Sequence, residues 1–264
     1  MQFLSIASGS SGNCLYAGNG SNSVLIDAGI SKKKILSGLD TIQVKPENID
    51  AILITHEHSD HIKGLGVMLR AYGTKVYATE ETFDEIMRTS AIGKVDTSLF
   101  NCVIPDKEIE IGSLKIKPFS ISHDAVNPIC FTISDSSGKI GIATDLGYYD
   151  DYIVDNLMDS QILLLEANHD INMLQVGFYP YKLKQRILSN MGHLSNENSG
   201  KLICRLLDGG LKHVFLGHLS KDNNYPELAY ETVKAEIKSG YGDVFPRLNI
   251  QVAERDVPSV PVII

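Results

Sequence analysis

Three histidines and one aspartate lie within six residues of this chain, a spacing that suits metal binding. They are His56, His58, Asp60 and His61. Buried imidazoles and carboxylates each need a polar partner, so four of them in one short stretch are poorly explained as core. A solvated polar loop is the plainer alternative. The alternate residues His56 and His58 can face one ion, and the turn after them lets Asp60 and His61 face a second. The stretch therefore predicts a metal site.

Further ligand candidates stand directly after apolar runs elsewhere in the chain. Two metal sites need more than four protein groups, because each ion takes three or four. His123 follows the run at 119–122, Asp145 the run at 141–144, and His218 the run at 214–217. Taken alone, each has an ordinary explanation, such as a surface histidine or, for Asp145, a helix cap. Active sites of α/β proteins lie where strands end, so the shared setting favours metal ligands.

The segments that must position these residues alternate between strand and helix patterns. The apolar run 51–55 is expected to be a central strand covered on both faces. Helices are predicted from an N-cap at Ser31 through about residue 39, over 62–72, and over 180–190 in the second half. Hydrophobic periodicity alone indicates only an α/β fold, which could be a doubly wound sheet. The histidine motif favours two mixed β-sheets packed face to face. We therefore predict a four-layer αββα sandwich in one domain over residues 1–264.

Composition and charge limit the classes of function. A net charge of −8 argues against broad electrostatic attraction to nucleic acid or to an anionic membrane. Bound metal ions would cancel carboxylate charge locally, so an acidic chain can still act on a phosphodiester. The first residues lack a basic segment, and no apolar run approaches the roughly 20 residues of a bilayer-spanning helix. The sequence predicts a cytoplasmic protein with no membrane partner, and it leaves the oligomeric state open.

The sequence resembles the metallo-β-lactamase superfamily over nearly its whole length. The signature motif and the later ligand positions of that family match seven residues: His56, His58, Asp60, His61, His123, Asp145 and His218. Asp27 matches an early acidic position that supports the site from below. Many true β-lactamases carry cysteine where this chain has Asp145, which points away from antibiotic hydrolysis.

The resemblance implies a cofactor of two divalent metal ions, which can be zinc, manganese or iron. His56, His58 and His123 would then hold the first ion. Asp60, His61 and His218 would hold the second. Asp145 would bridge the two ions together with a hydroxide that acts as the nucleophile. Asp60 and Asp145 are thus expected to serve catalysis as well as metal binding.

Two later segments resemble loops of the transfer-RNA 3′-processing nuclease. Glu166 follows an apolar run, and His193 lies in a Gly-His-Leu-Ser segment that opens a predicted helix. The two side chains could form a carboxylate–imidazole pair that donates a proton to the departing sugar oxygen. An ordinary surface histidine beside a helix cap at Ser195 is the alternative, and His169 is a rival proton donor.

A Ser-Gly-rich stretch near the N-terminus is either a hairpin turn or a cradle for phosphate. Small residues let backbone N–H groups approach an anion closely, so Ser10, Ser11 and Asn13 are candidate contacts to substrate phosphate, together with Asn168. This stretch and the two later segments resemble the WalJ-type (YycJ-like) bacterial branch of the superfamily. Its members are regarded as metal-dependent 5′-to-3′ exonucleases on DNA.

The predicted function is a two-metal phosphodiesterase that cuts nucleic acid, with DNA as the expected partner. A glyoxalase II-like thioesterase is the nearest alternative, but only one main helix and a strand are predicted after His218, too little for its helical glutathione domain. A metal-dependent binding or signalling module without turnover is a third possibility. The complete ligand set argues against that module.

Overall fold

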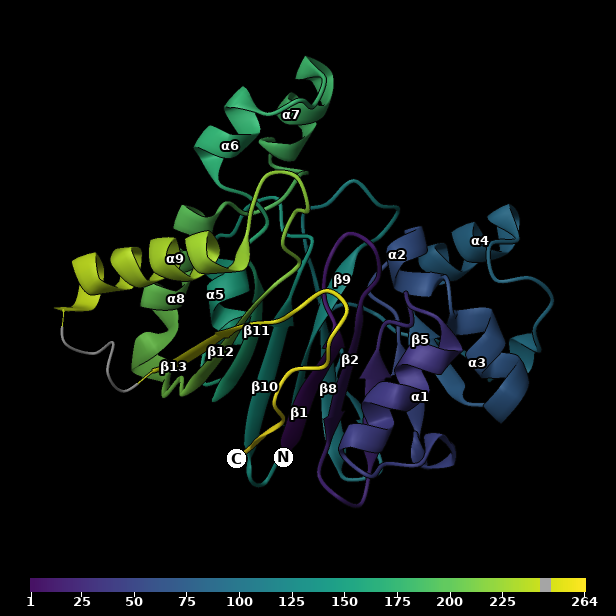
Figure 1. Cartoon of the computed structure of the whole chain (residues 1–264). Helices are drawn as coiled ribbons and strands as arrows, with labels where there is room; N and C mark the ends of the chain where they lie inside the picture. The colour runs from purple at the N-terminus through teal and green to yellow at the C-terminus, as the bar shows by residue number, and fades with distance from the viewer. Residues whose placement is uncertain (243–247) are drawn as a thin grey trace. The chain divides into compact units, whose positions relative to one another are not determined.

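The computed structural model describes residues 1–242 and 248–264. The predicted fold class is confirmed: the chain forms two mixed β-sheets flanked by helices (Figure 1). Within the described residues, no helix is both long and apolar enough to cross a membrane.

The strands are β1 (Gln2–Ala7), β2 (Cys14–Gly18), β3 (Ser23–Ile26), β4 (Ala51–Leu53), β5 (Lys75–Ala78), β6 (Phe100–Cys102), β7 (Ile109–Ile111), β8 (Leu114–Ser120), β9 (Ile129–Asp135), β10 (Gly138–Ala143), β11 (Ile162–Glu166), β12 (His213–Gly217), β13 (Asn249–Val252) and β14 (Val262–Ile263). The helices are α1 (Lys32–Thr41), α2 (Ser59–Ile62), α3 (Leu65–Tyr72), α4 (Glu80–Thr89), α5 (Asp151–Leu157), α6 (Ile171–Val176), α7 (Tyr181–Ile187), α8 (Asn196–Leu206) and α9 (Pro226–Tyr241), with short 3₁₀ turns η1 (Pro46–Asn48), η2 (Thr97–Leu99) and η3 (Leu207–Gly209).

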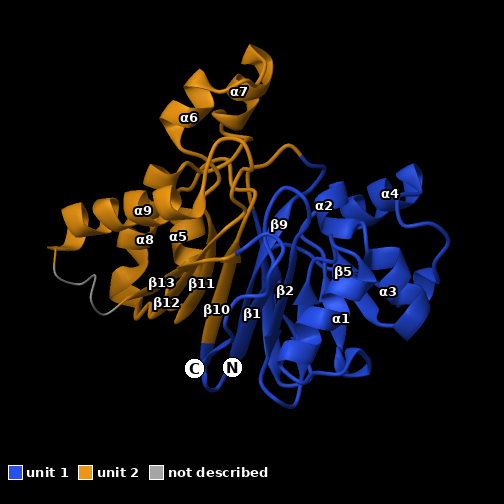
Figure 2. Ribbon diagram, in the orientation of Figure 1, with its two compact units in different colours: residues 1–120, 125–138, 254–264 blue, residues 121–124, 139–253 orange. Residues whose placement is uncertain are grey.

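The chain divides into two compact units (Figure 2). Unit 1 consists of residues 1–120, 125–138 and 254–264, and unit 2 of residues 121–124 and 139–253. The chain passes from one unit to the other several times, so neither unit is a continuous segment. The expectation of one domain over residues 1–264 stays a prediction.

Unit 1 contains a seven-stranded sheet in the order β14-β1-β2-β3-β4-β5-β6, and also the antiparallel strands β7, β8 and β9. Strands β3 to β6 run parallel to one another, so their carboxyl ends lie at one edge. β4 is buried throughout, as its apolar sequence predicts. Helix α1 begins as expected, because the Ser31 side chain accepts a hydrogen bond from the Lys34 N–H.

The helix predicted over residues 62–72 is instead two helices, α2 and α3. Gly64 separates them. A Cβ at this position would lie 2.0 Å from the Ile30 carbonyl oxygen, and the Gly64 N–H donates to the Ala28 carbonyl at 2.7 Å. Only glycine allows the backbone to come this close, and periodicity does not reveal such a contact.

Unit 2 contains the parallel strands β10, β11, β12 and β13, with α5, α8 and α9 among its helices. β11 is buried along its whole length, which fits its run of leucines. Helix α8 begins at the predicted cap, because Ser195 accepts from the Asn198 N–H. The helix expected over residues 180–190 is shorter, and α6 precedes it without having been predicted.

Candidate metal centre

The first group of candidate ligands follows β3 and β4 of unit 1. These strands pair in parallel, with Ile26 opposite Leu53, so Asp27 and the loop that begins after β4 emerge at the same edge. The loop then turns into α2, which carries Asp60 and His61. In unit 1 the motif therefore lies at the end of a strand, which is the location that the sequence predicted.

Asp27 and Thr55 hold two imidazole rings of this group, His56 and His61, by their Nδ1 atoms. Asp27 is buried and accepts from the Thr55 N–H at 2.9 Å, and its Oδ2 lies 2.8 Å from His61 Nδ1. Thr55 Oγ1 lies 3.0 Å from His56 Nδ1. A partner on Nδ1 fixes the ring and directs Nε2 outward, which is how metal-binding histidines are usually supported. Asp27 has the supporting position expected of it; Thr55 was not predicted.

The spacing of the donor atoms suits a divalent ion. His56 Nε2 lies 3.0 Å from His58 Nδ1, and His61 Nε2 lies 3.5 Å from Asp60 Oδ2. Two ligand atoms each ~2.1 Å from a tetrahedral zinc ion lie roughly 3.4 Å apart. Imidazole nitrogen and carboxylate oxygen are also donors that zinc, manganese and iron accept.

Asn13 belongs to this group, whereas the neighbouring serines lie at the surface. The Asn13 amide nitrogen is 3.1 Å from His61 Nε2, and its Oδ1 accepts from the Gly9 N–H at 2.9 Å. Ser10 and Ser11 are exposed. The role of the three residues as phosphate contacts stays a prediction.

A second group of candidate ligands lies at the carboxyl ends of β10, β11 and β12 in unit 2. Asp145, Glu166, His193 and His218 each offer one ligand atom, and these atoms all lie within 4.8 Å of one another. Asp145 Oδ1 is 3.6 Å from His218 Nε2 and 3.7 Å from His123 Nε2. Unit 2 thus brings together the three ligands that the sequence predicted for this part of the chain.

Glu166 supports two histidines at once. Its carboxylate is fully buried, and Oε2 lies 2.8 Å from His193 Nδ1 and 3.0 Å from His218 Nδ1. The backbone N–H groups of Asp145 and Leu194 donate to it at 3.0 and 2.6 Å. Burial alone would raise the pKa of Glu166, but the His193 charge and the bonds from both rings lower it. The predicted Glu166–His193 pair is present, and the contact with His218 was not foreseen.

His193 and His169 differ in the way a proton donor and a structural residue would differ. Burial alone would lower the pKa of His193, but the charge and hydrogen bond of Glu166 outweigh it and raise that pKa. The His193 side chain is 18% exposed, so solvent reaches it. His169 is buried, and neither ring nitrogen has a hydrogen-bond partner among the described residues. Burial lowers the pKa of His169 to about 4, which keeps the ring neutral.

Asn168 is buried beside the second group and supports its backbone. Its amide nitrogen donates to the His218 carbonyl at 3.0 Å, and its N–H donates to the Leu194 carbonyl at 2.9 Å. Asp124, which the sequence did not single out, lies 3.3 Å from His123 Nε2 and forms an ion pair with Arg186. The Gly192 carbonyl lies 3.2 Å from His123 Nδ1.

Three candidate site residues have left-handed backbone conformations. The φ angles are 60° at Asp27, 58° at Asp145 and 54° at His218. Each residue comes just after a strand. Non-glycine residues rarely adopt this conformation, and such strain collects at functional sites.

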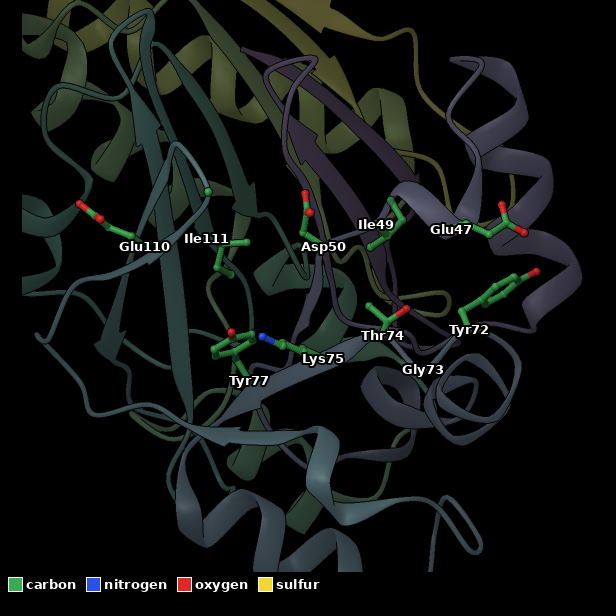
Figure 3. Close-up of a pocket in the computed structure, with 11 residues that line it drawn as sticks. Glu47, Ile49, Asp50, Tyr72, Gly73, Thr74, Lys75, Tyr77, Glu110 and Ile111 are labelled. Carbon is green, nitrogen blue, oxygen red and sulfur yellow. The ribbon is translucent and has the colours of Figure 1, made fainter.

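A cavity of about 470 Å³ lies in unit 1, and Figure 3 shows the residues that line it. Asp50 and Lys75 line it at the starts of β4 and β5, whereas the ligands follow the end of β4. None of the predicted site residues lines this cavity.

Comparison with known proteins identifies the family and the fold. The model of the β-lactamase superfamily domain matches residues 22–218. The chain is 45% identical over 228 residues to the exodeoxyribonuclease WalJ of Streptococcus pneumoniae. This alignment covers 86% of this chain and 85% of that protein. It is 36% identical to the exodeoxyribonuclease YycJ of Bacillus anthracis, covering 93% of each.

Solved structures with the same fold are more distant in sequence. The metallo-β-lactamase fold protein YhfI of Bacillus subtilis aligns with a TM-score of 0.70 at 16% identity, over 98% of this chain and all of that one. Human short-form tRNase Z aligns with a TM-score of 0.67 at 16% identity, over the whole of both chains. These likenesses confirm the fold.

Proposed function

This chain belongs to the β-lactamase superfamily and is a metal-dependent hydrolase, and on that premise we propose that it is an exodeoxyribonuclease that degrades DNA from the 5′ end. The observation that carries the proposal is the identity of 45% and 36% to two proteins named as exodeoxyribonucleases, over most of each chain. We also propose that the protein is cytoplasmic, on the ground that its proposed substrate is DNA.

The proposed cofactor is a pair of divalent ions. By the family motif, His56, His58 and His123 would hold one ion and Asp60, His61 and His218 the other, with Asp145 available to both. The short distances among donor atoms within unit 1 and within unit 2 and the nitrogen and oxygen donors fit metal binding. Two such ions supply an activated water and stabilise charge that develops on the phosphate.

A side chain of the protein protonates the leaving group. His193, held by Glu166 at 2.8 Å, gives its proton to the departing sugar oxygen. The raised pKa of His193 favours the protonated ring that this step needs. His169 stays neutral and buried, which leaves proton donation to His193, and Asn168 fixes the backbone of His218. Ser10, Ser11 and Asn13 contact the substrate phosphates.

The test is turnover of end-labelled single- and double-stranded DNA and RNA. Chelated protein is reloaded with zinc, manganese or iron in parallel, and bis-p-nitrophenyl phosphate and S-lactoylglutathione serve as small substrates. We expect chelator-sensitive release of nucleotides from DNA and from the phosphodiester, with little action on the thioester. Preferential hydrolysis of S-lactoylglutathione would replace the nuclease assignment with the thioesterase one.

A further inference from the structure

The segment from α6 through α7 exposes large apolar side chains to solvent. Phe178 is fully exposed at 107% of its reference surface, Val176 is 84% exposed and Tyr181 is 73% exposed. Only Leu174 of α6 and Ile187 of α7 are buried. The two helices stand away from the sheet of unit 2 (Figure 2), so this segment adds little to the core.

Specific hydrogen bonds hold the segment in this shape. Asp170 caps α6 by accepting from the Met173 N–H at 2.7 Å. Lys184 Nζ donates to the carbonyl of Gly177 at 2.6 Å, and the Tyr179 hydroxyl donates to Asp222 at 2.8 Å. The turn that carries Phe178 is therefore tied down on both sides, and the exposed ring is part of an ordered surface.

The segment is basic, although the chain as a whole is acidic. Residues 171–196 contain Lys182, Lys184 and Arg186 and no Asp or Glu, whereas the chain has a net charge of −8. Arg186 pairs with Asp124. Lys182 and nearby Lys221 are exposed and form no ion pair within residues 1–242 and 248–264.

The segment is joined to the second ligand group at its base. It is inserted between His169 and His193, and the Ser122 hydroxyl donates to the Asn190 carbonyl at 2.6 Å. Gly192, which follows the segment, contacts His123 through its carbonyl. A polymer held on the segment would therefore reach these candidate catalytic residues.

We propose that the α6–α7 segment is a platform that binds single-stranded DNA, with bases stacked on Phe178 and Tyr181 and phosphates at Lys182 and Lys221. Aromatic faces interleaved with cations are the pattern by which proteins bind single strands without reading sequence. A protein partner fits less well, because protein interfaces are poor in lysine. The inference rests on the proposed function, since it names how that substrate is held.

The absence of tryptophan from the chain gives a direct test of stacking. Phe178→Trp introduces a single indole at the platform, and Val260→Trp introduces one at an exposed position of unit 1. Metal-free protein is titrated with a single-stranded oligonucleotide. We expect saturable quenching of fluorescence for the first variant alone. Equal or absent quenching in both variants, with binding shown by anisotropy, would overturn the platform.

Alanine variants measure the contribution of each contact to affinity. Phe178→Ala and Tyr181→Ala should each raise Kd for the oligonucleotide about 5–150-fold, whereas Ile104→Ala, at an exposed site of unit 1, should not. Lys182→Ala should flatten the dependence of Kd on salt by roughly one phosphate contact, and Lys238→Ala should leave it unchanged. The rate of bis-p-nitrophenyl phosphate hydrolysis should match that of the wild type in the two control variants, Ile104→Ala and Lys238→Ala.

The outcomes separate this inference from the proposed function. Wild-type protein that shortens DNA, together with a Phe178→Ala variant of unchanged Kd, would overturn the platform alone. Wild-type protein that cleaves no nucleic acid, together with a Phe178→Trp variant that the oligonucleotide quenches, would overturn the proposed function alone. A changed oligomeric state of Phe178→Ala by light scattering, with unchanged Kd for DNA, would reassign the surface to a second copy of the chain.

Discussion

At the scale of single residues, the two ligand groups share one feature: a buried oxygen contacts the Nδ1 atom of His56 and His61 in unit 1 and of His218 in unit 2. Asp27 and Thr55 do this in unit 1, and Glu166 does it in unit 2. The support differs in one respect, because Glu166 holds His193 as well as the ligand candidate His218. Removal of His193 would leave the contact between Glu166 and His218 in place, whereas removal of Glu166 would not.

Replacement of His193 by alanine should slow cleavage according to the leaving group. If His193 protonates the sugar oxygen, cleavage of an oligonucleotide should fall about 10²–10⁴-fold in His193→Ala. Hydrolysis of a nitrophenyl ester should fall much less, because nitrophenolate departs without a proton. Steady-state rates on both substrates and the metal content of each preparation are the measurements. Equal losses on both substrates with metals retained would contradict the leaving-group role.

Glu166→Gln is the matched contrast. The sequence alone suggested a weaker copy of the His193 effect, but the 3.0 Å contact with His218 gives Glu166 a second task. We expect this variant to lose metal as well, since supporting partners of ligands typically contribute 10–100-fold to affinity or activity. Both substrates should then slow together.

At the scale of elements, the carboxyl ends of parallel strands collect the chemistry, and close backbone contacts hold the loops there. Gly29 shows how tight these contacts are: a Cβ at this position would lie 1.6 Å from the Asp60 carbonyl oxygen and 2.8 Å from the Asn13 nitrogen. Backbone atoms cannot move aside as a flexible side chain can. Glycine at position 29 is therefore required by the loop that leads into α2, the helix that carries Asp60.

Gly29→Ala should displace that loop and weaken metal binding in unit 1. Overpacking of this kind costs about 1–3 kcal/mol, and the displaced atoms belong to the residue proposed as a ligand. Chemical denaturation and metal analysis test this. Gly240→Ala is the control, because its added carbon would meet only the Cys204 side chain, at 3.1 Å. A Gly29→Ala protein with normal metal content and stability would show that the loop position does not matter.

The sequence pointed to the candidate ligands more clearly than to the residues that contact them. His123, Asp145 and His218 could be found because apolar runs mark buried strands and polar residues after them are conspicuous. Thr55 and the Gly192 carbonyl carry no such mark, since their roles depend on distances between segments far apart in the chain. Of the α6–α7 segment, α7 was predicted and α6 was not, because a helix that buries few apolar side chains has a weak hydrophobic periodicity.

At the scale of the whole molecule, acid sensitivity should follow from a buried neutral histidine. The pKa of His169 is lowered to about 4, mainly by burial, whereas an unfolded histidine titrates near 6.5. Below pH ~6.5, His169 is therefore protonated in the unfolded chain but stays neutral in the folded chain. Stability from this residue is present above pH ~6.5 and is lost as pH falls toward about 4.

His169→Asn should remove this part of the acid sensitivity. The free energy of unfolding of metal-free wild type should fall between pH 6.5 and 4 by about 3 kcal/mol more than that of the variant. Urea denaturation across this range measures the difference. His213→Asn is the control, because the His213 ring is only partly buried. Parallel curves for wild type and His169→Asn would show that His169 is protonated in the folded state.

The left-handed backbone at Asp27, Asp145 and His218 lowers the stability of the folded chain, while the side chains there serve the candidate site. Selection for activity and selection for stability therefore favour different residues at these positions. Glycine adopts these φ angles without strain, so each of the three side chains is kept at a cost to the folded chain. A descendant that had lost its substrate could relieve this strain with glycine at positions 145 and 218, whereas Asp27 would still be needed as the acceptor of the buried Thr55 N–H. Retention or loss of Asp145 and His218 among related sequences would thus separate working enzymes from copies that keep only the fold. That criterion can be applied without any assay.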